Sequence, residues 1–133
     1  MTKPTLDQLT SALHLSWDGD TCSDATEWSS GNPARGQCVA TSLVVQDYFG
    51  GDLLRYEVQG QGIRETHYCN ILDDGTILDT TGQQYRQPVT LHPLPVSLAG
   101  FTNVREKRLA DAVTRERYEL LKGRIALKLE GIV

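Results

Sequence analysis

The chain has 133 residues and a formal net charge of −4, with 39% hydrophobic and 23% charged residues. This composition is typical of one globular domain, here residues 1–133, and excludes a disordered chain. Nucleic acid and membranes are not expected as partners, because no basic run is long enough to bind them and no segment is apolar enough to cross a bilayer.

The first predicted element is a helix over residues 5–13. Thr5 and Gln8 have the spacing of a capping box, and apolar residues recur behind them at helical intervals. Residues 16–37 are then rich in Ser, Thr, Asp, Gly and Pro, a composition typical of loops. A loop of this length is uncommon unless it carries a function, so we expect it to be ordered and functional.

The second predicted helix runs from Cys38 to Phe49. Gly50 and Gly51 follow it and supply the left-handed backbone that commonly ends a helix. Four of its apolar residues form one stripe, which predicts a helix with a single buried face. The stripe consists of Val39, Leu43, Val44 and Tyr48.

Strands are predicted next, over Leu53–Val58, Ile63–Leu72 and Thr76–Thr80, with a short edge strand at Val89–Leu91. The last predicted helix is capped by Thr114 and carries one apolar side. That side consists of Tyr118, Leu121, Ile125 and Leu129. This order of elements predicts an α+β fold, with helices on one side of an antiparallel sheet.

Cys38 is the candidate nucleophile, because it stands where a Gly-containing loop changes to an apolar helix. A helix N-terminus stabilises a thiolate through its unpaired N–H groups and the positive end of its dipole. Gly36 would let the backbone approach a substrate closely, and N–H groups in this segment could hold an oxyanion. The alternative is that Cys38 is a small core residue, the usual role of a free cysteine.

His67 is the candidate general base. It lies in the middle of a predicted strand, where the alternating neighbours Cys69 and Ile71 suggest the buried face. A histidine that points into a protein needs polar partners. The alternative is a structural histidine whose hydrogen bonds are satisfied within the core.

Asp79 is the third candidate, and the register of a hairpin decides its role. With a three-residue loop, Asp73–Gly75, Cys69 pairs with Asp79, and Asp79 lies diagonally beside His67, within reach of a hydrogen bond. With a two-residue loop, Asp79 would instead face Asn70. The alternative role for Asp79 is to cap local N–H groups at the end of a strand.

Two further residues are predicted to contact substrate. Gln37 would donate to an oxyanion, and Trp28 would line the groove from the loop that precedes Cys38. The alternative for Trp28 is an aromatic lid over the core.

The cysteines also bear on metal binding and on the cellular compartment. A zinc site from Cys22, Cys38, His67 and Cys69 lacks any Cys-x-x-Cys pair, so neither a metal nor a cofactor is predicted. Three cysteines cannot all pair within one chain and no export signal is evident. The sequence therefore predicts free thiols and a cytoplasmic protein.

Several segments resemble known families. The segment Gly36–Cys38 and residues 44–51, 79–85 and 117–121 resemble small bacterial YunG-like proteins. Residues 67–70, 74–75 and 79–81 resemble the histidine and aspartate strands of transglutaminase-like proteins. The second resemblance implies a transglutaminase-like or papain-like core, in which the cysteine helix packs on a small antiparallel sheet between N- and C-terminal helices.

The resemblance to transglutaminase-like proteins also implies a reaction, acyl transfer by Cys38, His67 and Asp79. The substrate would be a small acyl compound or a peptide side chain, and hydrolysis, deamidation and transfer to an amine all remain open. The alternative is a non-catalytic binding module whose triad-like residues line a ligand pocket.

Overall fold

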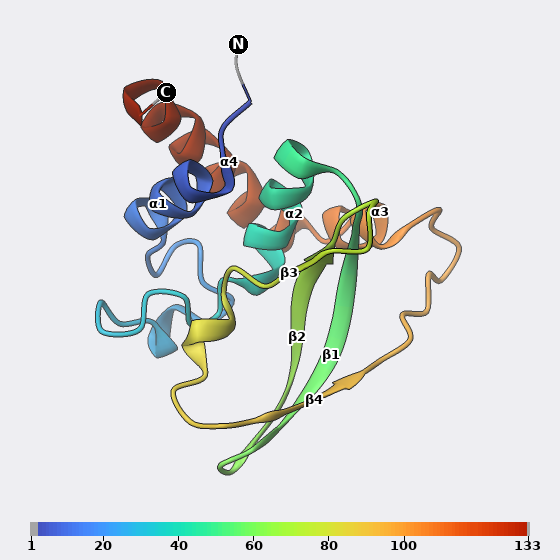
Figure 1. Cartoon of the computed structure of the whole chain (residues 1–133). Coiled ribbons are helices and arrows are strands. Elements are labelled where there is room, and N and C mark those ends of the chain that lie inside the picture. The colour runs from blue at the N-terminus through green and yellow to red at the C-terminus, as the bar shows by residue number, and fades with distance from the viewer. Residues whose placement is uncertain (1–2, 133) are drawn as a thin grey trace.

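The structure, a computed structural model, describes residues 3–132 and has an α+β fold (Figure 1). One antiparallel sheet has the strand order β3-β2-β1-β4. Helices α1, α2 and α4 gather on one side of it, as the sequence predicts, and the β1–β2 hairpin projects beyond them. The helices are α1 (Leu6–Ser16), α2 (Cys38–Phe49), α3 (Val104–Leu109) and α4 (Ala112–Ile132). The strands are β1 (Asp52–Gly60), β2 (Ile63–Ile71), β3 (Ile77–Leu78) and β4 (Thr90–Pro93). Two 3₁₀ helices are η1 (Ala25–Glu27) and η2 (Gly82–Gln84).

Helix α1 begins with the predicted capping box. The Thr5 hydroxyl accepts the N–H of Gln8, and the Gln8 side chain accepts the N–H of Thr5. The helix continues three residues beyond the predicted end, to Ser16. Leu9, Leu13 and Ser16 are all buried, so burial of this face continues to the end of the helix.

Helix α2 is more deeply buried than a single apolar stripe predicts. The six consecutive residues 40–45 are all buried, because the helix contacts both α4 and strands β1 and β2. Two residues of the helix accept hydrogen bonds from side chains inside the protein. The Trp17 indole N–H donates to the Thr41 hydroxyl at 2.9 Å, and the Asn70 side chain of β2 donates to the Ser42 carbonyl at 2.8 Å.

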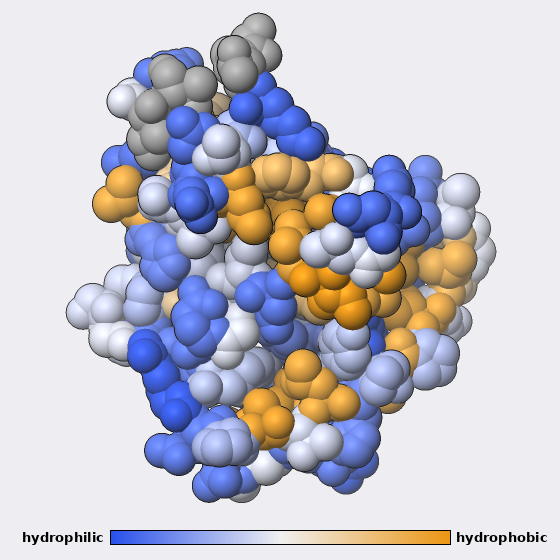
Figure 2. Space-filling model, in the orientation of Figure 1, coloured by the Kyte–Doolittle hydropathy of each residue, from blue (hydrophilic) through white to orange (hydrophobic). Residues whose placement is uncertain are grey.

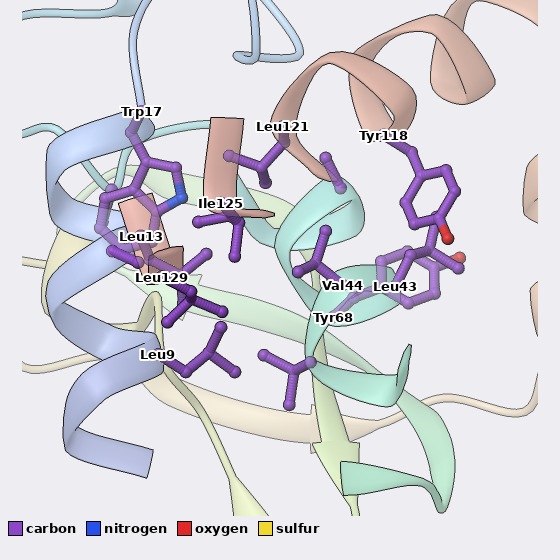
Figure 3. Close-up of a cluster of buried hydrophobic side chains, with 14 of the residues drawn as sticks. Leu9, Leu13, Trp17, Leu43, Val44, Tyr68, Tyr118, Leu121, Ile125 and Leu129 are labelled. Carbon is purple, nitrogen blue, oxygen red and sulfur yellow. The ribbon is translucent and has the colours of Figure 1, made fainter. Parts of the chain in front are cut away.

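Helix α4 covers the core with the predicted apolar side. Tyr118, Leu121, Ile125 and Leu129 are buried there against residues of α1 and α2 (Figure 3). The predicted cap is wrong: Thr114 lies inside the first turn, and Asp111 caps the helix. Its carboxylate accepts the N–H groups of Val113 and Thr114. Aspartate and threonine are both good capping residues, so the sequence did not distinguish them.

The β2–β3 hairpin has the register of the three-residue loop. Asn70 pairs with Leu78 and Ile71 with Ile77, and the N–H of Leu72 donates to the Thr76 carbonyl at 2.8 Å. The ladder ends at Leu78, however, so β3 is two residues long rather than the predicted five. The chain leaves the sheet at Asp79 and soon enters η2, which the sequence did not predict.

The edge of the sheet and the surface complete the description of the fold. Strand β4 pairs with β1 at the edge of the sheet and begins one residue later than predicted, at Thr90. On the face shown in Figure 2, apolar residues form patches among larger hydrophilic areas. Among the described residues, no helix is both long and apolar enough to span a bilayer.

Candidate functional site

Cys38 is the first residue of α2, as predicted. The preceding residue, Gln37, provides no side-chain cap. The first backbone hydrogen bond of the helix runs from the N–H of Thr41 to the Gln37 carbonyl at 3.0 Å. The N–H groups before Thr41 therefore have no acceptor within the helix. They leave the positive end of the helix dipole beside the Cys38 thiol.

His67 lies in the middle of β2, and its side chain is completely buried. Its Nε2 atom is 2.9 Å from each carboxylate oxygen of Asp79. The predicted contact between His67 and Asp79 is therefore present, and it follows from the register of the hairpin. Gly82 leaves room for it, because a Cβ atom at that position would come within 2.9 Å of the Asp79 carboxylate.

The second ring nitrogen of His67 is available to Cys38. Nδ1 is buried and has no hydrogen-bond partner of regular geometry among the described residues. Burial is the largest influence on this ring and disfavours its charged form. The hydrogen bond to Asp79 and the nearby Cys38 thiol outweigh it and raise the pKa of His67 to about 9. Cys38 acts both as a hydrogen-bonding group and, in its thiolate form, through its charge, so its sulfur lies beside the ring.

The raised pKa has a consequence for stability. Protonation of His67 favours the folded state, because the ring binds its proton more tightly there than at the ordinary value of 6.5. This contribution is complete below about pH 6.5 and is lost as the pH rises through about 9. At neutral pH the ring is therefore an imidazolium held between a carboxylate and a thiol.

Tyr85 is a site residue that no sequence pattern identifies. Its ring contacts His67 edge to face, with centroids 5.3 Å apart and planes at 80°. Its hydroxyl donates to Glu65 at 3.1 Å. Burial raises the pKa of Tyr85, and the charges of Glu65 and Cys38 add to the effect. Tyr85 thus holds one side of the His67 ring and lies in the electric field of the thiol.

Arg35 and Glu65 connect this histidine to the loop before Cys38. The Arg35 guanidinium donates to the same Glu65 oxygen as Tyr85, at 2.7 Å, and to Gln84 at 3.2 Å. The Gln84 side-chain oxygen also accepts the N–H of Gly36 at 3.4 Å. No local sequence signal identifies these residues, because their partners are 30 to 49 positions away.

The other two cysteines are buried, and all three are free. Burial raises the pKa of Cys22, and its sulfur lies 3.1 Å from the carbonyl oxygens of both Asp24 and Arg35, so its one S–H is shared between them. Burial, with the charges of Asp79 and Cys38, raises the pKa of Cys69 to about 12. Neither thiol therefore ionises readily near neutral pH.

The three predicted substrate-binding residues have structural contacts of their own. Gln37 is fully buried and donates from Nε2 to the Asp18 carbonyl at 3.0 Å. Trp28 stabilises the loop that contains it, because its indole N–H donates to the Pro33 carbonyl at 3.1 Å. Gly36 has φ +74°, and a Cβ there would lie 2.3 Å from the Cys22 sulfur. Its requirement for glycine is thus explained within the protein, and a contact with substrate stays a prediction.

Metal ligation was the remaining interpretation of the cysteines. Within the part of the chain that the structure describes, no three His, Cys, Asp or Glu side chains form a group that could hold a metal ion.

Comparison with known proteins places the chain in a family. A model of the YunG protein family matches residues 5–130. Over 120 residues, the chain is 28% identical to a Bacillus subtilis (strain 168) protein described as "Uncharacterized protein YunG", and the match covers 90% of each chain. No solved structure matches significantly, so no structural relative supports a papain-like or transglutaminase-like core. The resemblance to YunG-like proteins is confirmed, and the chain belongs to the YunG family.

Proposed function

We propose that this protein is a cysteine-dependent acyl-transfer enzyme in which Cys38, His67 and Asp79 act as a catalytic triad. The observation that carries the proposal is the orientation of His67. Asp79 binds Nε2 at 2.9 Å, which leaves Nδ1 for the thiol at the start of α2. A nucleophile, a base and a group that orients the base form the arrangement that nucleophilic catalysis requires.

The proposed reaction begins when the Cys38 thiolate attacks the carbonyl carbon of an amide, ester or thioester. A C–S bond forms, and the carbonyl oxygen becomes an oxyanion that the free N–H groups at the start of α2 stabilise. The imidazolium of His67 then gives its proton to the leaving group as the bond to that group breaks. An acyl-thioester on Cys38 remains. An acceptor then attacks the thioester carbonyl, and His67 takes a proton from that acceptor as the thiolate leaves.

The acceptor determines the outcome of the second half-reaction. Water gives hydrolysis, or deamidation when the substrate is a carboxamide, and an amine gives acyl transfer. Cys38 is partly exposed whereas the His67 ring is completely enclosed, which favours an extended substrate group that reaches the thiol from the surface. A small acyl compound or a peptide side chain fits this requirement.

A transglutaminase-like or papain-like arrangement is part of the proposal. The supporting features are the order of the elements, with the cysteine helix α2 before the histidine strand β2 and the aspartate after it, and the antiparallel sheet behind them. Three free thiols fit a reducing compartment, and we propose the cytoplasm as its location.

An activated ester tests the proposal. After brief exposure to p-nitrophenyl acetate, we expect the intact protein to gain one acetyl group, located on Cys38 by peptide mapping. The thiolate displaces p-nitrophenolate, so the acetyl thioester and the released phenolate should appear in equal amounts. Cys38→Ser should abolish the rapid labelling, and Cys22→Ser, which alters a buried thiol, should not.

The result also decides between an enzyme and a binding module. Equal labelling of the wild type and the Cys38→Ser variant would remove Cys38 from the chemistry. A wild-type protein that takes up no acetyl group would favour the non-catalytic alternative, in which the same residues only line a pocket.

A further inference from the structure

A small cavity of about 40 Å³ lies where the first turn of α2 meets α3 and the start of α4. Arg108 comes from α3, and Thr114 and Arg117 come from the first turns of α4. The exposed residue Ser23 is part of its wall, so the cavity is open to solvent on that side. The remaining lining residues are Thr21, Gly36, Val39 and Ala40.

Both arginines at this cavity lack a carboxylate partner. Among the described residues, neither Arg108 nor Arg117 lies within ion-pair distance of an acidic side chain. Two acids lie near them and are hydrogen-bonded elsewhere. Asp111 caps α4 by accepting the N–H groups of its first turn, and Asp24 accepts the N–H and the hydroxyl of Thr26. Two guanidinium charges around one small space repel each other, and an anion bound directly between them would lower this repulsion further.

Arg108 is held in place and still has an unused donor. Its guanidinium lies over the ring of Tyr68, 5.6 Å from the centroid, and donates to the Thr114 hydroxyl at a long 3.4 Å. Its Nε atom is buried and has no hydrogen-bond partner among the described residues. Arg117 is fixed from the other side by donating to the Ser23 carbonyl at 3.0 Å. The guanidinium groups of both arginines are thus held at the wall of the cavity.

The start of α2 adds to the positive potential. Val39 and Ala40 lie in the first turn of that helix, before the first N–H that is hydrogen-bonded within it, and no side chain caps the turn. The volume is also larger than the roughly 10–15 Å³ that one water needs. The charge, the free donors and the size all fit the same class of ligand.

We propose that this cavity binds a small oxyanion, a phosphate or carboxylate group, between Arg108, Arg117 and the first turn of α2. The anion would accept hydrogen bonds from the guanidinium groups of Arg108 and Arg117 and would neutralise their charges. The ligand is either a free ion or the charged end of a larger molecule. The Cys38 side chain does not line this cavity, but both proposals use free N–H groups of the first turn of α2, so the anion is tested by its binding and not by the reaction.

Titration with inorganic phosphate and with acetate, at constant ionic strength set by chloride, tests the site. We expect at least one of them to bind saturably with a Kd below about 1 mM. In NMR spectra the largest shifts should occur at the backbone N–H groups of Val39, Ala40 and Thr114. Phosphate alone would identify a tetrahedral anion, and acetate alone a carboxylate.

Variants of the arginines provide the control. Arg117→Gln should weaken binding at least about tenfold, which is about 1.4 kcal/mol, and Arg117→Lys should restore part of it; Arg108→Gln serves as a second variant. Arg64→Gln, on the exposed β1–β2 hairpin, should change nothing. No saturable binding, shifts centred elsewhere, or equal affinity in the Arg117→Gln and Arg64→Gln variants would each overturn the proposal.

Discussion

Replacing Gly36 with alanine should destabilise the protein by about 2–5 kcal/mol. The position has φ +74°, where an L-residue with a side chain is strained, and the new Cβ would lie 2.3 Å from the Cys22 sulfur. The backbone strain contributes about 1–2 kcal/mol. The clash of the new methyl group with the Cys22 sulfur adds the cost of inserting an extra group into a filled space. Urea unfolding at neutral pH measures the loss of unfolding free energy.

Two other variants separate these causes. Gly75 has φ +89°, and a Cβ there would have no atom within 4 Å. The unfolding free energy of Gly75→Ala should therefore fall only by the cost of backbone strain. Adding Cys22→Ala to Gly36→Ala should recover part of the stability, because it removes the sulfur that the new methyl group meets. If Gly36→Ala costs no more than Gly75→Ala, the close contact between this loop and Cys22 is wrong.

Replacing His67 with glutamine should slow alkylation of Cys38 by iodoacetamide about 100-fold at neutral pH. The pKa of His67 is raised to about 9, so at neutral pH the ring is charged and stabilises negative charge that develops on the Cys38 sulfur as it reacts. Glutamine can keep a hydrogen bond to Asp79 but carries no charge. The rate is measured as loss of free thiol, with the modified residue identified by peptide mapping.

The pH dependence makes this test specific. The advantage of the wild type should shrink as the pH rises through about 9, because His67 then loses its proton. Asp79→Asn should give a smaller loss, since an amide can hold the wrong tautomer of the ring. His14→Gln, a change at an exposed histidine of α1, should leave the rate unchanged. Equal rates in the His67→Gln variant and the wild type would mean that His67 does not activate Cys38.

The core of the candidate site could be predicted because its signals are local. The change from loop to apolar helix at Cys38 marked the start of α2. The hairpin loop at Asp73–Gly75 set the register that brings Asp79 to His67, even though β3 is too short to form the predicted pair of Cys69 and Asp79. In a hairpin, loop length and strand periodicity determine which side chains share a face.

The support around the triad could not be predicted, because it depends on contacts between distant segments. Tyr85 reaches His67 and Glu65 only because the chain leaves the sheet at Asp79 and forms η2. Strand β3 is therefore shorter than predicted: it begins one residue later, at Ile77, and ends before Asp79. Arg35 similarly reaches Glu65 across 30 positions. Periodicity describes one element at a time and carries no information on which loop packs against it.

Helix burial shows the same limit. An apolar stripe predicted one buried face for α2, but Thr41 and Ser42 are buried too. The Thr41 hydroxyl accepts from the indole of Trp17, and the Ser42 backbone carbonyl accepts from the side chain of Asn70; these partners lie 24 and 28 positions away. A polar residue is expected to be exposed when only the sequence is known, because its buried partner cannot be identified.

The central claim is that Cys38, His67 and Asp79 act as one unit, and a titration of the His67 side chain by ¹H–¹⁵N NMR tests it most directly. The protein has three histidines, so the His67 signals can be assigned by substitution. We predict that His67 keeps its second proton up to about pH 9. Its pKa should fall in Cys38→Ala and in Asp79→Asn, because each variant removes a partner of the charged ring. A wild-type ring that titrates near the ordinary value of 6.5, or that is indifferent to both substitutions, would contradict the account.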